Sequence, residues 1–166
     1  MSQSCSMLTP SEYRRTYGCE NIKSLLDEGR VRGATKTGKN EWLIPNGALI
    51  EYRPKGKALS FDKRTIMDDM WDILKASSKK MTYIDSAVLK TSDEQFNNAV
   101  SLLVECELLI RSPTPSDSVT ANGFSITTKG IARLQDAKDK RGWREIYALT
   151  IASASNGFAQ AILETA

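Results

Sequence analysis

The stretch from Thr9 to Pro45 constrains the fold more than any other part of the chain. Apolar spacing predicts two short helices there, over residues 11–17 and 20–28, with the single glycine Gly18 between them. Gly18 supplies the permissive backbone that a tight turn needs. A basic hairpin that closes with an aromatic residue and a proline follows the second helix.

The first of these helices has clear start signals. Thr9 is placed to accept hydrogen bonds from the amides of the first turn, Pro10 fits the first helical position, and Glu12 has capping-box spacing from Thr9. Leu8 and Tyr13 flank the cap in the manner of a hydrophobic staple. The helix is therefore predicted from several independent local signals.

In the second helix, Ile22, Leu25 and Leu26 form an apolar stripe, and Gly29 ends the helix. The polar residues that this stripe leaves pointing away from the core are Glu20, Asn21, Lys23, Ser24 and Asp27. Two short strands joined by a turn at residues 37–40 then carry the cations Arg30, Arg32, Lys36 and Lys39. The whole pattern predicts a helix-turn-helix with a β-hairpin wing.

The run GRVRGATKTGKNEWLIP, residues 29–45, resembles the wing of excisionase-type winged helix-turn-helix domains, relatives of the MerR class. The shared pattern is a glycine after the second helix, a basic hairpin and an aromatic-x-Ile-Pro close. This resemblance covers residues 8–45 and implies DNA binding through the second helix and the wing. The turn before the second helix is shorter than in the family. Recognition helices usually read bases with their N-terminal residues, so the difference concerns the base-reading role of Glu20 and Asn21.

Composition and charge favour a nucleic-acid partner. Residues 1–59 hold ten Lys and Arg against six Asp and Glu, and residues 60–166 hold thirteen against fourteen. Basic residues beside a helix-turn-helix pattern suit a polyanion, the alternative being a solvated basic surface. No apolar run approaches the ~18 residues of a bilayer span, and the start of the chain lacks signal-peptide features, so a cytoplasmic, nucleoid-associated protein without membrane contact is expected.

Several classes of chemistry are not expected. The chain has no histidine, which removes the commonest general base and metal ligand. Cys5, Cys19 and Cys106 are odd in number and far apart, so thiols are expected rather than a disulfide framework or a zinc site. Residues 33–40 come within one residue of the phosphate-loop pattern but lack its flanking strand and helix and its hydroxyl residue. We expect neither an enzyme nor a cofactor.

Residues 53–57 combine proline and glycine with charges of one sign, which predicts a linker and a boundary near residue 57. A short extended segment is expected just before it, around Ile50. From Asp62 a helix is predicted that buries Ile66, Met70, Ile73 and Leu74 and leaves Asp68, Asp69 and Asp72 outside. A solvated helix face is favoured for this acidic trio over a divalent-cation site.

A second helix-turn-helix is predicted after this helix. A short helix is expected over residues 81–90 and another from Thr91 onward, followed by a strand over 108–111, a polar loop over 112–123 and a returning strand over 124–127. The run TTKGIARL, residues 127–134, resembles the segment after the wing in MarR- and PadR-type winged helices. This less specific resemblance spans about residues 60–137.

The start of the second recognition helix is polar and carries no base; we expect it to expose Thr91, Ser92, Asp93, Gln95, Asn97 and Asn98. Gln and Asn can bond adenine edges, whereas the acids Asp93 and Glu94 mostly favour the helix dipole. Two interpretations stay open: a DNA contact, or a structural or partner-binding module. Residues 143–163 carry an apolar helical stripe, which indicates a dimerising helix or a cap on the second core.

The expected fold is mainly α with small β-wings (α+β): a winged helix-turn-helix with linker over 1–57, a second winged helix over 58–140 and a C-terminal helix over 141–166. The expected function is sequence-specific binding of double-stranded DNA by a homodimeric transcriptional regulator of a phage, plasmid or other mobile element. The alternatives are an architectural factor for recombination, partition or packaging, and a protein-interaction adaptor. The candidate DNA contacts are Glu20, Asn21, Lys23, Ser24, Arg30, Arg32, Lys36, Lys39, Asn40, Thr91, Ser92, Gln95 and Asn98.

Overall fold

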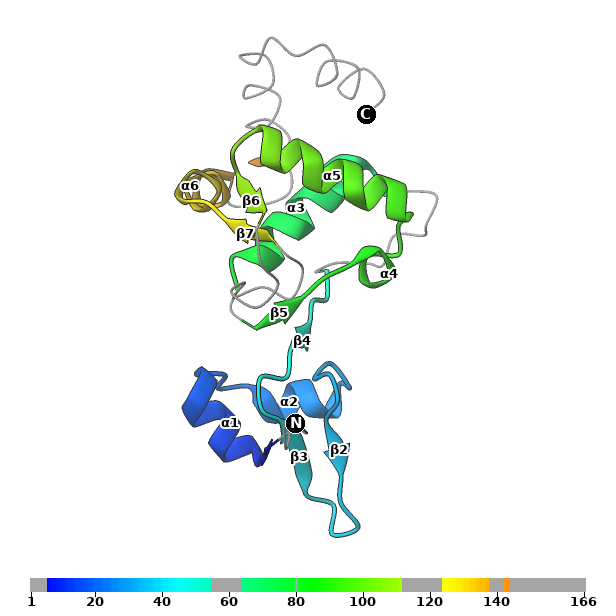
Figure 1. Cartoon of the computed structure of the whole chain (residues 1–166), viewed down its shortest axis with the longest axis vertical. Coiled ribbons are helices and arrows are strands. Elements are labelled where there is room, and N and C mark those ends of the chain that lie inside the picture. Colours follow the sequence, from blue (N-terminus) through cyan, green and yellow to red (C-terminus); the bar gives the residue numbers. More distant parts are fainter. Residues whose placement is uncertain (1–5, 55–63, 80, 112–123, 138–141, 144–166) are drawn as a thin grey trace, which may run out of the picture.

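The computed structural model describes residues 6–54, 64–79, 81–111, 124–137 and 142–143. They form two units, each with its own apolar core, on either side of strand β4 (Ile50–Glu51; Figure 1). We call residues 7–50 the N-terminal unit and residues 52–143 the second unit. The architecture is α+β, with helices and small separate sheets, as predicted.

The N-terminal unit is built from two helices and an antiparallel sheet with the strand order β1-β3-β2. In this sheet Leu8 lies opposite Ile44, and Lys36 lies opposite Trp42. We call β2, β3 and their connecting turn the hairpin. The elements in chain order are β1 (Met7–Leu8), α1 (Pro10–Tyr17), α2 (Ile22–Asp27), β2 (Thr35–Lys36) and β3 (Trp42–Pro45).

The predicted start of α1 is confirmed in detail. The Thr9 hydroxyl accepts a hydrogen bond from the Glu12 amide at 3.3 Å, and the Glu12 carboxylate accepts one from the Thr9 amide at 2.8 Å. Together they form a capping box. At the other end, Gly18 adopts φ +71°, a left-handed conformation that ends α1 and turns the chain. Local sequence signals therefore define α1 at both ends.

Helix α2 is shorter than predicted, because it begins at Ile22 rather than at Glu20. Asn21 has φ −93° and ψ 23°, outside the helical region, and makes no side-chain cap. Glu20 and Asn21 consequently lie in the turn before α2, and the prediction that they occupy the first turn of the helix was wrong. The physical reason is that the chain needs the residues after Gly18 to bring Ile22 into the core, where it is 2% exposed.

The N-terminal core joins both helices to the hairpin. Its buried side chains include Tyr13, Leu26 and Ile44, and the Tyr13 hydroxyl donates a hydrogen bond to the Ala48 carbonyl at 2.6 Å. The predicted hairpin turn is confirmed: the Thr37 amide donates to the Glu41 carbonyl at 2.8 Å. This core supports the hairpin at its base, while the tip extends away from the second unit (Figure 1).

The second unit follows the order of elements expected from the sequence, with one additional strand. Helix α3 packs mainly against α5, and β6 pairs with β7 so that Leu109 lies opposite Ile126. Its elements are α3 (Ile66–Ser77), β5 (Thr82–Tyr83), α4 (Ser86–Leu89), α5 (Asp93–Glu105), β6 (Leu109–Arg111), β7 (Phe124–Ile126) and α6 (Thr128–Ala137).

Residues 81–90 do not form the single helix that was predicted. Thr82 and Tyr83 form β5, which pairs in parallel with β4 (Ile50–Glu51), and only residues 86–89 are helical. Helix α4 starts later because Asp85 caps it, accepting a hydrogen bond from the Val88 amide at 2.8 Å. The strand that replaces the first part of the helix depends on a partner outside the segment.

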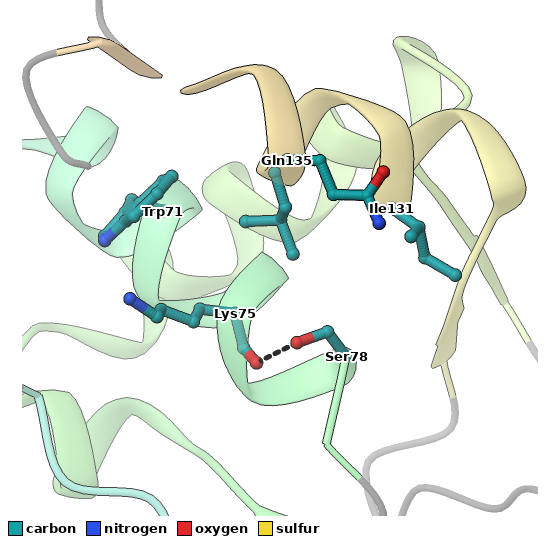
Figure 2. Close-up of a pocket in the computed structure, with 6 residues that line it drawn as sticks. Trp71, Lys75, Ser78, Ile131 and Gln135 are labelled. Carbon is teal, nitrogen blue, oxygen red and sulfur yellow. Dashed lines mark hydrogen bonds between the residues drawn. The ribbon is translucent and has the colours of Figure 1, made fainter. Parts of the chain in front are cut away.

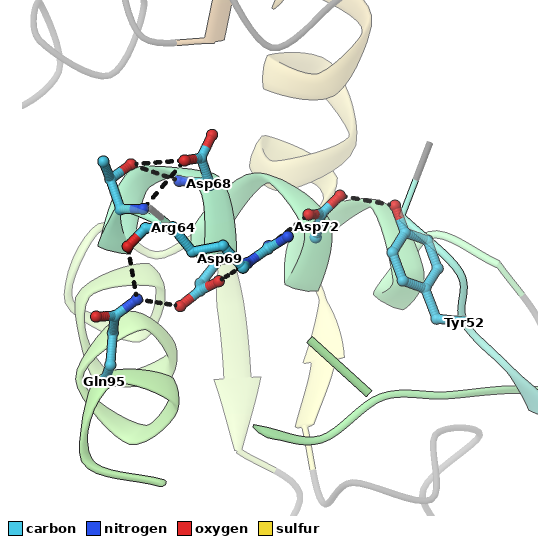
Figure 3. Close-up of polar contacts among 7 residues, drawn as sticks. Tyr52, Arg64, Asp68, Asp69, Asp72 and Gln95 are labelled. Atoms are coloured by element: carbon cyan, nitrogen blue, oxygen red, sulfur yellow. Dashed lines mark hydrogen bonds and ion pairs between the residues drawn. The ribbon is translucent and has the colours of Figure 1, made fainter. Parts of the chain in front are cut away.

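The acidic trio of α3 is buried, so the prediction of a solvated helix face was wrong. Asp68, Asp69 and Asp72 are 4%, 0% and 2% exposed. The Arg64 guanidinium donates to Asp69 at 2.7 Å and to Asp72 at 2.6 Å (Figure 3). Asp68 instead completes a capping box with Thr65 at the start of α3. Each carboxylate is therefore compensated within the fold, as buried charges require.

The chain passes from one core to the other at β4. Ile50 packs against the N-terminal core, and Tyr52 is 5% exposed within the second core. The change of core thus occurs before the linker expected at residues 53–57. Most of the predicted C-terminal helix lies outside the described residues, but Trp143 is buried in the second core, with its ring 6.1 Å from that of Trp71.

Candidate nucleic-acid interface

The hairpin presents two lysines to solvent. Lys36 is exposed on β2, and its ammonium lies 4.9 Å from the centre of the Trp42 ring on the adjacent strand. Lys39 is exposed in the turn, next to Asn40, which adopts the left-handed region with φ +60°. Within the part of the chain that the structure describes, neither lysine has a carboxylate partner. Both cations are available to an anionic ligand.

Helix α2 adds one more exposed cation. Lys23 is exposed and also has no carboxylate partner among the described residues. Its neighbour Ser24 donates a hydrogen bond from its hydroxyl to the Glu28 carboxylate at 3.1 Å. This bond, followed by one from Arg30, lowers the pKa of Glu28. Ser24 is therefore engaged within the helix, whereas Lys23 is not.

Arg30 is held inside the molecule. Its guanidinium donates two hydrogen bonds to the Glu51 carbonyl, at 3.1 and 3.0 Å, and one to the Glu28 carboxylate at 3.3 Å. The side chain is only 21% exposed. Arg53 also pairs with Glu28, at 3.6 Å. The sequence grouped Arg30 with the other cations of the wing, but the structure separates it from them.

Arg32 has a different environment again. Its guanidinium carbon lies 3.5 Å from the centre of the Tyr83 ring, which belongs to β5 of the second unit. The residue as a whole is exposed. A guanidinium stacked on a tyrosine face is attracted by the ring electrons and keeps its charge. Arg32 thus contacts the second unit, whereas Lys36 and Lys39 project from the hairpin.

The candidates at the start of α5 are divided in the same way. Thr91 is 8% exposed, so its predicted exposure was wrong. The side-chain amide of Gln95 donates to the Asp69 carboxylate at 2.6 Å. Ser92 caps α5 by accepting a hydrogen bond from the Gln95 amide group of the backbone at 3.1 Å. Asn98 is exposed, and so are the acids of the first turn, Asp93 and Glu94. The charged side chains of this first turn are thus acidic.

Helix α1 carries two further cations that were not predicted as contacts. Arg14 and Arg15 are exposed, and neither forms an ion pair with a carboxylate among the described residues. The signal was present, because Tyr13 and Tyr17 mark the inner face of α1 and leave both arginines on the outer one. Helix α1, which carries them, lies on the far side of the N-terminal unit from β2 (Figure 1). The turn residues Glu20 and Asn21 are exposed as well.

A small cavity of about 330 Å³ opens in the second unit between α3 and α6 (Figure 2). None of the predicted site residues lines it. Over the described ranges, no His, Cys, Asp or Glu cluster is arranged to hold a metal ion, and no helix is long and apolar enough to cross a membrane. The residues that line the cavity are Trp71, Lys75, Ser78, Ile131, Leu134 and Gln135.

No family model matches this chain, and neither a curated protein nor a solved structure is significantly similar to it. The function is therefore inferred from the residues and their geometry alone.

Proposed function

We propose that this protein binds double-stranded DNA through its N-terminal unit. The hairpin grips the sugar-phosphate backbone with Lys36 and Lys39, and α2 faces the adjacent groove with Lys23. The supporting observation is that these three cations are exposed and have no carboxylate partner among the described residues. Each phosphate that a lysine neutralises releases counterions, which drives association.

The shapes of the two elements support the same proposal. A major groove admits an α-helix, and a hairpin beside such a helix reaches the neighbouring backbone or minor groove. The exposed turn residue Asn21 carries an amide of the kind that reads adenine edges. We therefore favour a sequence-specific protein, and within that class a transcriptional regulator of a mobile element.

Fluorescence anisotropy with a labelled duplex tests the proposal. The logarithm of the association constant should fall linearly with the logarithm of the salt concentration. Lys36→Ala combined with Lys39→Ala should lower the magnitude of that slope by about 1.8, since each phosphate contributes about 0.9. The control is Lys129→Ala with Arg133→Ala, which removes an exposed and a half-buried cation of the second unit, both ion-paired. Equal effects of the two double variants would contradict the proposal.

A second candidate function applies to the second unit only. The first turn of α5 exposes Asp93 and Glu94, while Thr91 and Gln95 face inward. These observations favour a module that holds a protein partner or a second copy over one that reads DNA. Crosslinking of the full chain to a photoreactive duplex distinguishes the two: crosslinks on α2 and the hairpin alone support the interaction module, and crosslinks on α5 contradict it.

A further inference from the structure

Strand β4 is hydrogen-bonded to both units at once. On one side, the Arg32 amide donates to the Leu49 carbonyl at 2.9 Å and the Glu51 amide donates to the Arg30 carbonyl at 2.8 Å. On the other side, the Ile50 amide donates to the Met81 carbonyl at 2.7 Å. The Tyr52 amide donates to the Tyr83 carbonyl at 2.8 Å. The backbone ladder therefore continues across the boundary between the units.

The side chains around β4 reinforce this ladder. Ile50 enters the N-terminal core, and Tyr52 enters the second core, where its hydroxyl donates to Asp72 at 3.0 Å. Burial and the adjacent Asp72 raise the pKa of Tyr52, so the hydroxyl keeps the proton that this bond needs. A linker between independent domains makes few such contacts.

The contacts extend from Tyr52 to helix α5. Asp72 accepts a hydrogen bond from Arg64, Arg64 also donates to Asp69, and Asp69 accepts one from Gln95 (Figure 3). Burial works against the charged form of Arg64, but the bonds to the two aspartates outweigh it and raise the pKa of the guanidinium. The chain leaving the N-terminal unit is thus bound to both α3 and α5.

Two arginines close the joint from the N-terminal side. Arg30 binds the Glu51 carbonyl with two hydrogen bonds, and Arg32 stacks on the Tyr83 ring at 3.5 Å. Tyr83 is itself fixed, because its hydroxyl donates to Asp85, the cap of α4, at 2.6 Å. A phosphate would have to compete with this stacking to engage Arg32.

We propose that the two units form one rigid body and that Arg32 is a positioning residue of the joint, not a phosphate contact. The joint holds the hairpin in a fixed orientation relative to α5. Its consequence for DNA rests on the proposed function: the distance between the hairpin and whatever the second unit binds is fixed, so a ligand that engages both must have matching spacing. The joint itself can be measured without DNA.

Distances between spin labels test the joint directly. Labels on Arg15→Cys in α1 and Asn98→Cys in α5, two exposed positions, report the relative placement of the units by pulsed electron paramagnetic resonance. The background is the full chain with its three native cysteines replaced by alanine. The parent should give a single narrow distance distribution. Arg32→Ala and Tyr83→Leu should each broaden it, and the double variant should broaden it little further, because both remove the same contact.

The matched control is Arg53→Ala, which removes an exposed arginine that pairs with Glu28 at 3.6 Å. It should leave the distribution narrow. A broad distribution in the parent, or an unchanged one in Arg32→Ala, overturns the proposal. Circular dichroism identifies any variant that has lost its fold. Tyr83→Phe loses the hydroxyl bond to Asp85 but keeps the ring under Arg32, so it should give a narrower distribution than Tyr83→Leu.

The salt dependence of DNA binding provides the second readout. If Arg32 positions the units, Arg32→Ala leaves the salt slope unchanged, as Tyr83→Leu does. If Arg32 holds a phosphate, Arg32→Ala alone lowers the slope by about one, and this outcome overturns the positioning role. Absence of DNA binding in every form would contradict the proposed function while leaving the distance measurement to decide the joint.

Discussion

The ammonium group of Lys36 lies 4.9 Å from the centre of the Trp42 ring, and the two residues face each other across the strands of the hairpin. Trp42 packs against the N-terminal core, so the lysine is supported by a ring that the core holds in place. A second such pair exists: the Lys75 ammonium lies 5.0 Å from the ring centre of Trp71 in the second unit. The two lysines have similar local contacts but belong to different units.

This similarity gives a matched pair of variants. Lys36→Met and Lys75→Met should each lower the free energy of unfolding by about 1 kcal/mol or less, at the lower end of the range for a cation over an aromatic ring. Only Lys36→Met should reduce the salt slope of DNA binding, by about one, because only Lys36 meets a phosphate. Urea unfolding and anisotropy titration measure the two quantities. A slope change of the same size in Lys75→Met would place DNA on the second unit as well.

Charge reversal at two exposed glutamates should distinguish the two units by a gain of DNA binding in one of them. Glu41 lies in the turn of the hairpin, and Glu94 lies in the first turn of α5. Glu41→Lys adds a cation beside the proposed phosphate contacts and should raise the salt slope by about one. Glu94→Lys should leave binding unchanged, while costing about 0.3–1 kcal/mol of stability by opposing the helix dipole. Tighter binding by Glu94→Lys would contradict the assignment of α5 to a role away from DNA.

The capping box of α1 predicts a pH dependence. Hydrogen bonds from the backbone amide and the hydroxyl of Thr9 lower the pKa of Glu12 in the folded state. A depressed pKa contributes stability above the unfolded value of about 4.3, and that stability is lost as the pH falls through the folded pKa. Glu12→Gln should therefore be less stable than the parent at pH 7, and the difference should shrink towards pH 3. Urea unfolding at both pH values measures it; a difference that grows on acidification would contradict the cap.

Arg64 should be among the residues most important for the second unit. Its side chain is 5% exposed and compensates Asp69 and Asp72, both buried. Arg64→Met leaves two buried carboxylates without their cation, and removing one partner of a buried ion pair typically costs about 3–5 kcal/mol. Replacing both aspartates by asparagine in the Arg64→Met background should recover part of the loss. Chemical unfolding measures both; a loss below about 1 kcal/mol would contradict the proposed compensation.

The parts of the fold that the sequence predicted correctly depend on neighbours in the chain. Thr9 and Glu12 lie three residues apart, and their pairing needs nothing beyond the first turn of α1. The acidic trio was misassigned because the same spacing on a helix suits a solvated face or a buried one. Arg64 decides between them, and the packing of α3 against α5 buries its ion pair with Asp69.

The candidate site also contains residues with local and with long-range determinants. Lys36 and Lys39 were found from the hairpin signal, since the turn alone determines that they project outward. Arg32 has the same charge and lies in the same run, but its partner Tyr83 is far away in the sequence. Its role depends on the pairing of β4 with β5, and β5 was itself missed because its hydrogen-bond partner, β4, lies far away in the sequence. Long-range pairing is the information that periodicity does not contain.

The close contact between α6 and β6 gives the last prediction. A Cβ added at Gly130 would lie 2.4 Å from the Leu108 carbonyl oxygen, which accepts a hydrogen bond from the Thr127 amide at 3.0 Å. Gly130→Ala must therefore push α6 away from β6 and should cost about 1–3 kcal/mol, as overpacking does. Gly38→Ala is the control, because a Cβ there meets nothing within 4 Å, and it should be neutral or slightly stabilising. Thermal unfolding followed by circular dichroism compares the two. Equal stabilities of Gly130→Ala and Gly38→Ala would mean that α6 does not pack on β6 as described.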